Sequence, residues 1–351
     1  MRNKIYIFAS LCLACFLLNC KQQVPSHIEY EKSFEEIAQL AATENKYFCI
    51  ILSHPACPPC EALHTRLFDE VSFAVGNKAI FNIVDITLPE NKWYQQFIFS
   101  KSQPATLLFS PKVELITIIQ GASRASTECI KNVINGKPEC VRYRNNLLFS
   151  EAIASGEAVQ ALNLILTAKR KIENNRDATA ELAESMQTLY YPYPLWLQIQ
   201  NEQNKGNTED AVFLARQMLT FQEPWHAELY NDLFLASRQV IDPDFDIANM
   251  PVLEIENDDI HLGSLQKDEK ADIRIKLKNA GKETLAILDV SVGCSCLALL
   301  SGISHEIEAD NEEYLHLQFT AEHQGEISRN VMITNNGIVP VKTIVIRANV
   351  K

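Results

Sequence analysis

The chain has 351 residues, of which 47% are hydrophobic, so it is long enough to form two or three packed domains. Its 44 acidic residues outnumber its 32 basic residues and give a net charge of −12. This charge argues against binding of nucleic acid, and against binding of anionic lipid by charge alone. After residue 20 no stretch is apolar for about 18 residues, so we expect no membrane-spanning helix beyond that point.

The first 20 residues have the pattern of a targeting segment. Arg2 and Lys4 give a positive start, and residues 5–18 are apolar. The apolar run is short for a membrane span, and cleavage as an ordinary signal or retention as an anchor stay open as alternatives to lipidation. In each case we expect the chain to leave the cytoplasm, where disulfides can persist. Residues 21–30 are then expected to form a short tether.

The end of this segment, with the sequence Leu-Leu-Asn-Cys at residues 17–20, resembles the signal of bacterial lipoproteins. The resemblance implies that Cys20 becomes the lipidated first residue of the mature protein. Asn19 departs from the pattern, because a small residue is more usual there. The resemblance implies a protein of the cell envelope of a Gram-negative-type bacterium, anchored to the membrane by lipid and facing the periplasm or the surface.

Residues 31–46 have a helical pattern of apolar residues. Ser33 is a candidate cap of this helix, with Glu36 three residues later in the arrangement of a capping box.

Two cysteines, Cys57 and Cys60, lie between a predicted strand at 47–52 and a predicted helix at 61–68. The helix N-terminus favours negative charge, so it stabilises a thiolate at Cys57 and makes that sulfur a nucleophile near neutral pH. Cys60 can then attack a mixed disulfide formed at Cys57. Half of a zinc site and a structural disulfide are the alternatives for a Cys-x-x-Cys pair, and the strand–helix context favours redox chemistry.

From residue 47 to about 134 the chain resembles thioredoxin, on the Cys-Pro-Pro-Cys motif at 57–60 and on residues 102–109, which look like the cis-proline segment of that family. The resemblance implies an α/β domain over 31–140, thiol–disulfide exchange with protein thiols and disulfides, and no cofactor, because the cysteine pair carries the two electrons. It implies that Pro104 shapes the substrate groove and that Gln103 offers backbone hydrogen bonds to a substrate peptide. The remaining expected elements are a strand at 80–86, a helix at 93–99, a strand at 113–119 and a helix from 123.

Departures from thioredoxin affect the support of the cysteines. Ile51 stands where thioredoxin has a buried carboxylate that helps to deprotonate the second cysteine, so proton transfer at Cys60 needs water or another group. His54 and Glu61 are the nearest candidates, and an exposed loop histidine without a role is the alternative for His54. Two tryptophans of the family are also replaced, by Ser53 and Ala56.

The other cysteines have less definite roles. Cys49 lies in the apolar strand and is expected to be an inert core thiol. Cys129 and Cys140 are expected either to form a disulfide that closes the last thioredoxin-like helix or to stay as two thiols.

Residues 141–245 are rich in Leu, Ala, Gln and Glu and poor in glycine, which predicts a helical region. Gly156 and Gly206 share a Gly-x4-Ala spacing, and the region resembles a degenerate tetratricopeptide repeat. The two glycines are 50 residues apart, so a regular array is not expected, and a generic helical connector is the alternative.

Residues 252–351 contain six or seven runs with strand alternation and predict an immunoglobulin-like β-sandwich. The turn signals 279–281 and 335–337 are both Asn-x-Gly. The segment resembles a bacterial envelope domain of unknown function that carries such turns and a Cys-Gly-Cys-like motif. In this sequence the motif contains Cys294 and Cys296, and a disulfide, a soft-metal pair such as for Cu(I), or two buried thiols are all open.

These observations predict a multidomain α/β, α and β protein that acts as an envelope thiol–disulfide oxidoreductase through Cys57 and Cys60. The rival prediction is a non-catalytic envelope lipoprotein that binds partners or serves as a scaffold through its helical and immunoglobulin-like domains. A metal-handling protein that uses Cys294 and Cys296 is the third.

Overall fold

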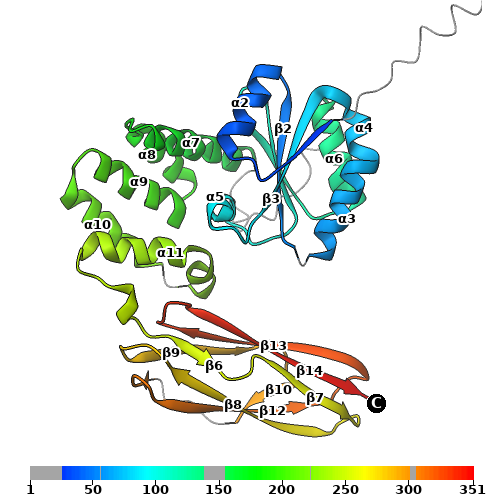
Figure 1. The fold of residues 1–351 in the computed structure, drawn as a ribbon, viewed down its shortest axis with the longest axis vertical. Helices are drawn as coiled ribbons and strands as arrows, with labels where there is room; N and C mark the ends of the chain where they lie inside the picture. The colour runs from blue at the N-terminus through cyan, green and yellow to red at the C-terminus, as the bar shows by residue number, and fades with distance from the viewer. Residues whose placement is uncertain (1–25, 56, 138–154, 222, 301–305) are drawn as a thin grey trace, which may run out of the picture. The chain divides into compact units, whose positions relative to one another are not determined.

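The computed structural model describes residues 26–55, 57–137, 155–221, 223–300 and 306–351. The chain divides into two compact units, Met1–Leu166 and Thr167–Lys351, which we describe separately (Figure 1). The lipidation prediction at Cys20 and residues 21–25 of the predicted tether lie outside the described residues.

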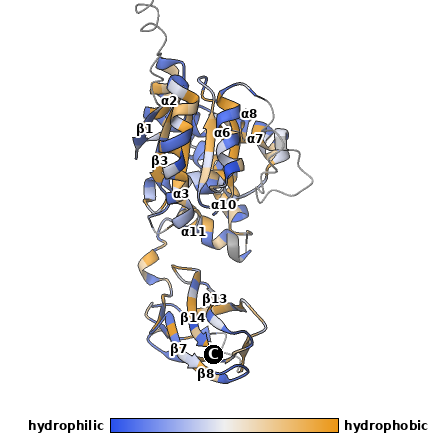
Figure 2. Ribbon diagram, turned by 90° about the vertical axis from the view of Figure 1, so that its right-hand side faces the viewer, coloured by the Kyte–Doolittle hydropathy of each residue, from blue (hydrophilic) through white to orange (hydrophobic). Residues whose placement is uncertain are grey.

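The first unit is built on a five-stranded sheet in the order β1-β3-β2-β4-β5. β1 pairs parallel with β3 and β3 pairs parallel with β2, whereas β4 is antiparallel to both of its neighbours. Figure 2 shows hydrophobic residues gathered in the strands of this unit. The strands are β1 (His27–Tyr30), β2 (Tyr47–Ser53), β3 (Ala79–Asp85), β4 (Ala105–Phe109) and β5 (Leu115–Gln120).

The tether prediction is wrong for its last four residues. His27–Tyr30 form the edge strand β1 instead, in register with β3 from His27 opposite Ile80 to Tyr30 opposite Ile83. These residues form a strand because they pair with the open edge of the sheet at β3. Four residues of mixed polarity show no alternation from which a strand could be predicted.

Helices cover both faces of this sheet. On one face Phe34 of α2 packs edge-to-face on Phe48, Phe109 and Trp93. On the other face Ile51 shares a core with residues from α3, η1 and α6. The predicted capping box at Ser33 and Glu36 is formed. The helices are α2 (Phe34–Glu44), α3 (Pro58–Arg66), η1 (Leu67–Val71), α4 (Ser72–Val75), η2 (Gly76–Lys78), η3 (Pro89–Asn91), α5 (Lys92–Ile98) and α6 (Arg124–Ile134).

The second unit begins within α7 and continues through a helical part. Gly206 has a φ of +80°, which suits glycine, and joins α9 to α10. Gly156 is the second residue of α7, and residues 138–154, which precede this helix, lie outside the described part of the chain. The helices are α7 (Ser155–Glu173), α8 (Thr179–Thr188), α9 (Pro192–Asn204), α10 (Thr208–Met218), α11 (Pro224–Ile241) and η5 (Ile247–Asn249).

Two sheets, in the orders β10-β12-β8-β6 and β11-β9-β13-β14-β7, enclose one hydrophobic core at the end of the second unit. The prediction of six or seven strands falls short of the nine that the described residues form. Of these, β10 and β11 have only three and two residues, which carry no readable alternation. The strands are β6 (Leu253–Ile255), β7 (Asp259–Leu265), β8 (Lys270–Asn279), β9 (Leu285–Val292), β10 (Leu297–Leu299), β11 (Glu306–Ile307), β12 (Glu312–Thr320), β13 (Gly325–Asn335) and β14 (Val341–Val350).

Both Asn-x-Gly turns pack against the chain where it enters this sandwich. In each turn the asparagine Oδ1 accepts a hydrogen bond from the glycine N–H, at 3.0 Å for Asn279 and Gly281 and at 2.8 Å for Asn335 and Gly337. A Cβ atom on Gly281 would lie 2.3 Å from the carbonyl oxygen of Met250. Glycine is therefore required at this position by a close approach of two backbones.

We expect Gly281→Ala to destabilise the sandwich by about 1–3 kcal/mol, because the methyl group has only backbone atoms to displace. Hydrogen exchange of peptides from β8 and β9, followed by mass spectrometry, should show faster exchange than in the unsubstituted chain. Gly156→Ala is the matched control, since nothing lies within 4 Å of a Cβ there. Equal exchange in both variants would contradict the close approach.

Candidate active site

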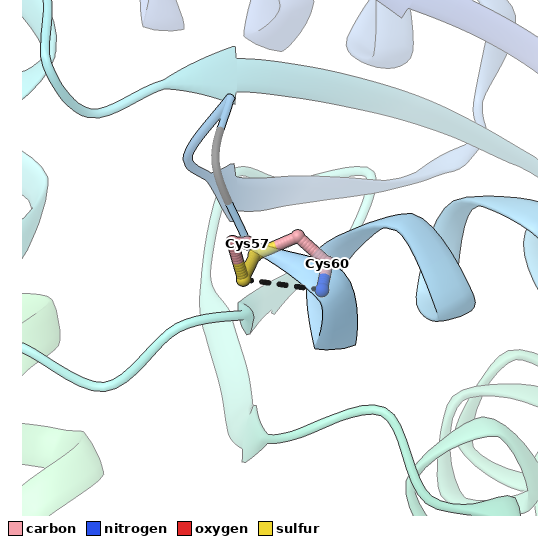
Figure 3. Close-up of a disulfide and its surroundings, with 2 residues drawn as sticks. All are labelled: Cys57 and Cys60. Atoms are coloured by element: carbon pink, nitrogen blue, oxygen red, sulfur yellow. Dashed lines mark hydrogen bonds between the residues drawn. A yellow bond between two sulfur atoms is a disulfide. The ribbon is translucent and has the colours of Figure 1, made fainter. Parts of the chain in front are cut away.

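The cysteine pair is positioned by the end of a central strand. Every residue of β2 from Phe48 to Ser53 is buried, and the chain leaves the sheet at Ser53 before it enters α3 at Pro58. Proline suits this first helical position because the N–H that it lacks would have no partner within the helix. Cys57 is the N-cap of α3, and its Sγ accepts a hydrogen bond of 3.2 Å from the N–H of Cys60 (Figure 3).

Cys57 and Cys60 form a disulfide with a Cα–Cα separation of 5.2 Å. The two residues differ in access: Cys57 is half-buried, whereas Cys60 is 1% exposed. A thiolate from another molecule therefore reaches Cys57 more readily than Cys60. This difference suits Cys57 as the sulfur that exchanges with substrate and Cys60 as the one that resolves the mixed disulfide.

Pro104 is preceded by a cis peptide bond from Gln103. Ala105, the next residue, pairs with Leu52 in the register of β4 and β2, so Pro104 lies at the end of the sheet from which the chain runs to Cys57. Gly121 donates a hydrogen bond of 2.8 Å to the carbonyl oxygen of Pro104. Gln103 is half-buried, and its backbone N–H and carbonyl make no hydrogen bond to another described residue.

The groups predicted to support Cys60 lie at the rim of the site. Glu61 is exposed at the first turn of α3, and His54 is half-buried in the loop before the helix.

Two buried polar groups near Cys60 were missed by the sequence argument. His64 follows Cys60 by four residues on α3, so the two side chains lie on one face of the helix. The Nε2 atom of His64 is shielded from solvent and has no hydrogen-bond partner among the described residues. The Oγ1 atom of Thr106, a residue that is 1% exposed, is likewise shielded from solvent and has no hydrogen-bond partner among the described residues.

Thr106 faces the helix that carries the cysteines. It lies directly opposite Ile51 in the register of β4 and β2, so both side chains point to the same face of the sheet. Ile51 packs in a core with Leu63 of α3. On this side of the sheet Thr106 contributes a buried hydroxyl, and α3 carries the imidazole of His64. The four-residue spacing from Cys60 could have identified His64 in the sequence as a residue on the same face of the helix. Thr106 is identified as a residue of this site only by the register of β4 on β2.

Burial sets the ionisation of the groups near the pair. It lowers the pKa of His64 from its ordinary value, an effect that the carboxylate of Glu61 partly offsets. Burial therefore favours the neutral imidazole of His64. Burial raises the pKa of the Cys49 thiol, the only free cysteine among the described residues, which fits the expected inert core thiol.

The remaining cysteines are oxidised where the structure describes them. Cys129 is disulfide-bonded, and its predicted partner Cys140 lies outside the described residues. Cys294 and Cys296 form a disulfide, so the alternatives of two thiols and of a Cu(I) pair do not apply to this state. In the described parts of the chain no three His, Cys, Asp or Glu residues gather in a way that could hold a metal ion.

Among the helices that the structure describes, none is long and apolar enough to cross a membrane.

The comparisons with known proteins fall on separate parts of the chain. Residues 253–350 match the family described as "Protein of unknown function (DUF1573)". No curated protein matches the chain. Among solved structures, a protein of unknown function from Porphyromonas gingivalis W83 is 21% identical, with a TM-score of 0.27 and coverage of 31% of this chain and 50% of that one. The chain therefore spans about half the length of that protein.

Two thioredoxins are also similar to part of the chain. Thioredoxin from Malassezia sympodialis is 19% identical, with a TM-score of 0.27, over 32% of this chain and 93% of that one. Thioredoxin NaTrxh from Nicotiana alata is 16% identical, with a TM-score of 0.26, over 32% of this chain and 95% of that one. At these identities and scores the chemistry must be argued from the cysteines and their surroundings.

Proposed function

We propose that this chain is a thiol–disulfide oxidoreductase that acts on protein thiols and disulfides. The observation that carries the proposal is the Cys57–Cys60 disulfide at the N-terminus of α3, with an accessible first cysteine and a buried second one. Cis-Pro104 at the same end of the sheet supports it. No cofactor is required, because the pair itself stores the two electrons.

In the reducing direction the Cys57 thiolate attacks one sulfur of a substrate disulfide. A mixed disulfide forms, and the other substrate sulfur leaves as a thiolate. Cys60 then loses its proton and attacks Sγ of Cys57, which restores the disulfide and releases the second substrate thiolate. Gln103 presents its backbone N–H and carbonyl to an extended substrate segment, with Pro104 setting the direction of the chain there.

His64 takes up the proton that Cys60 releases in this second step. It lies one helical turn beyond Cys60, burial favours its neutral form by lowering its pKa, and its shielded Nε2 makes no hydrogen bond to a described residue. Thr106 offers a hydroxyl on the same side of the sheet. These groups replace the carboxylate that Ile51 does not provide.

His64→Gln should slow release of substrate from the mixed disulfide by on the order of a hundredfold near pH 7, because glutamine fills similar space but takes up no proton. The rate of this step should be measured by stopped flow at a series of pH values. The rise in rate that accompanies ionisation of Cys60 should occur at higher pH in His64→Gln than in the unsubstituted chain. Glu70→Gln, at an exposed position on η1, is the control and should stay near the rate of the unsubstituted chain. An unchanged pH profile in His64→Gln would remove the histidine from the mechanism.

Equilibrium titration of the pair tests the proposal itself. Full-length protein would be equilibrated across glutathione ratios, quenched with an alkylating reagent and read by mass spectrometry of the Cys57–Cys60 peptide. A potential near about −270 mV indicates a reductant fed by a donor, and one near about −120 to −180 mV indicates an oxidant or isomerase. If the pair never cycles between dithiol and disulfide, the scaffold function takes its place.

We further propose that the protein is held at the membrane of a bacterial cell envelope by a lipid on Cys20, with an immunoglobulin-like domain at its C-terminal end. The signal-like residues 1–20 and the disulfides support this location. Cys20→Ser should move the protein from the membrane fraction to the soluble fraction, as measured by immunoblot. Full retention in the membrane fraction would argue against lipidation at this residue.

A further inference from the structure

The segment that contains Cys294 and Cys296 joins the two sheets of the sandwich. β9 belongs to the five-stranded sheet and β10 to the four-stranded sheet, and residues 293–296 make the turn between them. The disulfide closes over a single residue, Ser295, with a Cα–Cα separation of 5.2 Å.

This crossing is already fixed by its own backbone hydrogen bonds. Gly293 donates to the carbonyl of Asn330 at 3.1 Å, and Thr320 donates to the carbonyl of Cys296 at 2.8 Å. In the chain-entropy view, a disulfide stabilises a fold less as the loop that it closes becomes shorter, and this loop is very short. Stabilising the sandwich is therefore a poor explanation for two cysteines at this place.

The two sulfurs differ in access in the same sense as the pair on α3. Cys294 is half-buried and packs at the margin of the sandwich core, whereas Cys296 is 6% exposed and belongs to that core. The corresponding residues at the first site are half-buried Cys57 and buried Cys60. An incoming thiolate thus meets the first cysteine of each pair, and the second cysteine is the leaving group held inside the fold.

We propose that Cys294–Cys296 is a second redox-active disulfide, whose exchange partner is the Cys57/Cys60 dithiol of a second copy of the chain. The assignment of a dithiol to Cys57 and Cys60 rests on the function proposed above. The redox activity of Cys294–Cys296 itself rests on the short loop and on the difference in access, and it is testable without the first pair.

The exchange balances without another oxidant or reductant. The Cys57 thiolate attacks Sγ of Cys294, the Cys294–Cys296 bond breaks, a Cys57–Cys294 disulfide forms and Cys296 leaves as a thiolate that takes up a proton. Cys60 then gives up its proton and attacks Sγ of Cys57, which forms Cys57–Cys60 and releases the Cys294 thiolate. Two electrons pass from the first pair to the second, and the reverse reaction follows the same steps.

A redox titration of the full-length, unsubstituted protein tests the second pair first. Native protein is equilibrated across glutathione ratios, alkylated, and the peptide containing Cys294 and Cys296 is analysed by mass spectrometry. We expect a reversible transition within the glutathione range while the sandwich stays folded, as judged by hydrogen exchange. A pair that stays oxidised until the sandwich unfolds is structural, and that result overturns the proposal.

Trapping tests the partner. A chain with Cys60→Ser and Cys296→Ser keeps one accessible cysteine from each pair and should accumulate a Cys57–Cys294 disulfide between two copies under mild oxidation. The matched control, Cys60→Ser with Cys294→Ser, leaves buried Cys296 and should lose this cross-link. Equal cross-linking of both chains, or none in either, overturns the exchange.

Failure of this inference is distinguishable from failure of the proposed function. If a chain with both Cys294→Ser and Cys296→Ser still reduces a disulfide-bonded protein, and the second pair does not titrate, the first site stands and the second falls. If Cys57–Cys60 never cycles, but the second pair is reduced by dithiothreitol in the folded protein, the second site stands and only its partner is wrong.

Discussion

Cys57→Ser is expected to reduce the turnover of a disulfide-bonded protein substrate to the rate of the reaction without enzyme. The hydroxyl of serine is nearly isosteric with the thiol but does not form a thiolate at neutral pH, so no mixed disulfide starts the cycle. The N-cap position tolerates the change, because a serine oxygen accepts the hydrogen bond from Cys60 N–H that Sγ accepts now. Hydrogen exchange of β2 and α3 should therefore match that of the unsubstituted chain.

Cys60→Ser is the informative partner of this variant. It keeps the attacking thiolate and removes the resolving one, so covalent adducts of substrate on Cys57 should accumulate and be visible by non-reducing electrophoresis. Full turnover by the Cys57→Ser chain would rule out the mechanism, and absence of adducts in the Cys60→Ser chain would exclude Cys57 as the attacking sulfur.

Ile51→Asp is expected to have the largest effect on stability. Ile51 is fully buried, and the residue opposite it on β4 is Thr106, whose side chain offers a hydroxyl. An ionised carboxylate without a charged partner there should destabilise the first unit by on the order of 3–5 kcal/mol. Ile51→Val is the control and should cost about 0.5–1.5 kcal/mol.

The pH dependence of this variant follows from the same burial. The introduced carboxyl has a raised pKa in the folded chain and a value of about 3.9 in the unfolded chain. As pH rises above about 3.9 the unfolded chain loses its proton first, so the penalty grows with pH and is complete above the folded pKa. Hydrogen exchange of β2 peptides should therefore show a larger difference from Ile51→Val at pH 8 than at pH 4.5. A difference independent of pH would show that the site accommodates the charged carboxylate.

The sequence was sufficient for the local features of the first unit. A buried strand that gives way to a helix at a Cys-x-x-Cys pair is a pattern of neighbours along the chain, and so is the capping box at Ser33. The segment at Pro104 was found by resemblance, and its cis peptide bond agrees with it. These features depend on spacing and local propensity, which a sequence carries directly.

The rest was decided by contacts between distant residues. Only the register of β4 on β2 places Thr106 opposite Ile51. The lowered pKa of His64 and the exposure of Glu61 both depend on how α3 packs in the folded chain. Oxidation of Cys294 and Cys296 depends on the geometry of a crossing between two sheets, which the spacing of the two residues left open. Strand pairing and burial join residues far apart in sequence, and no periodicity along the chain encodes which partner each strand takes.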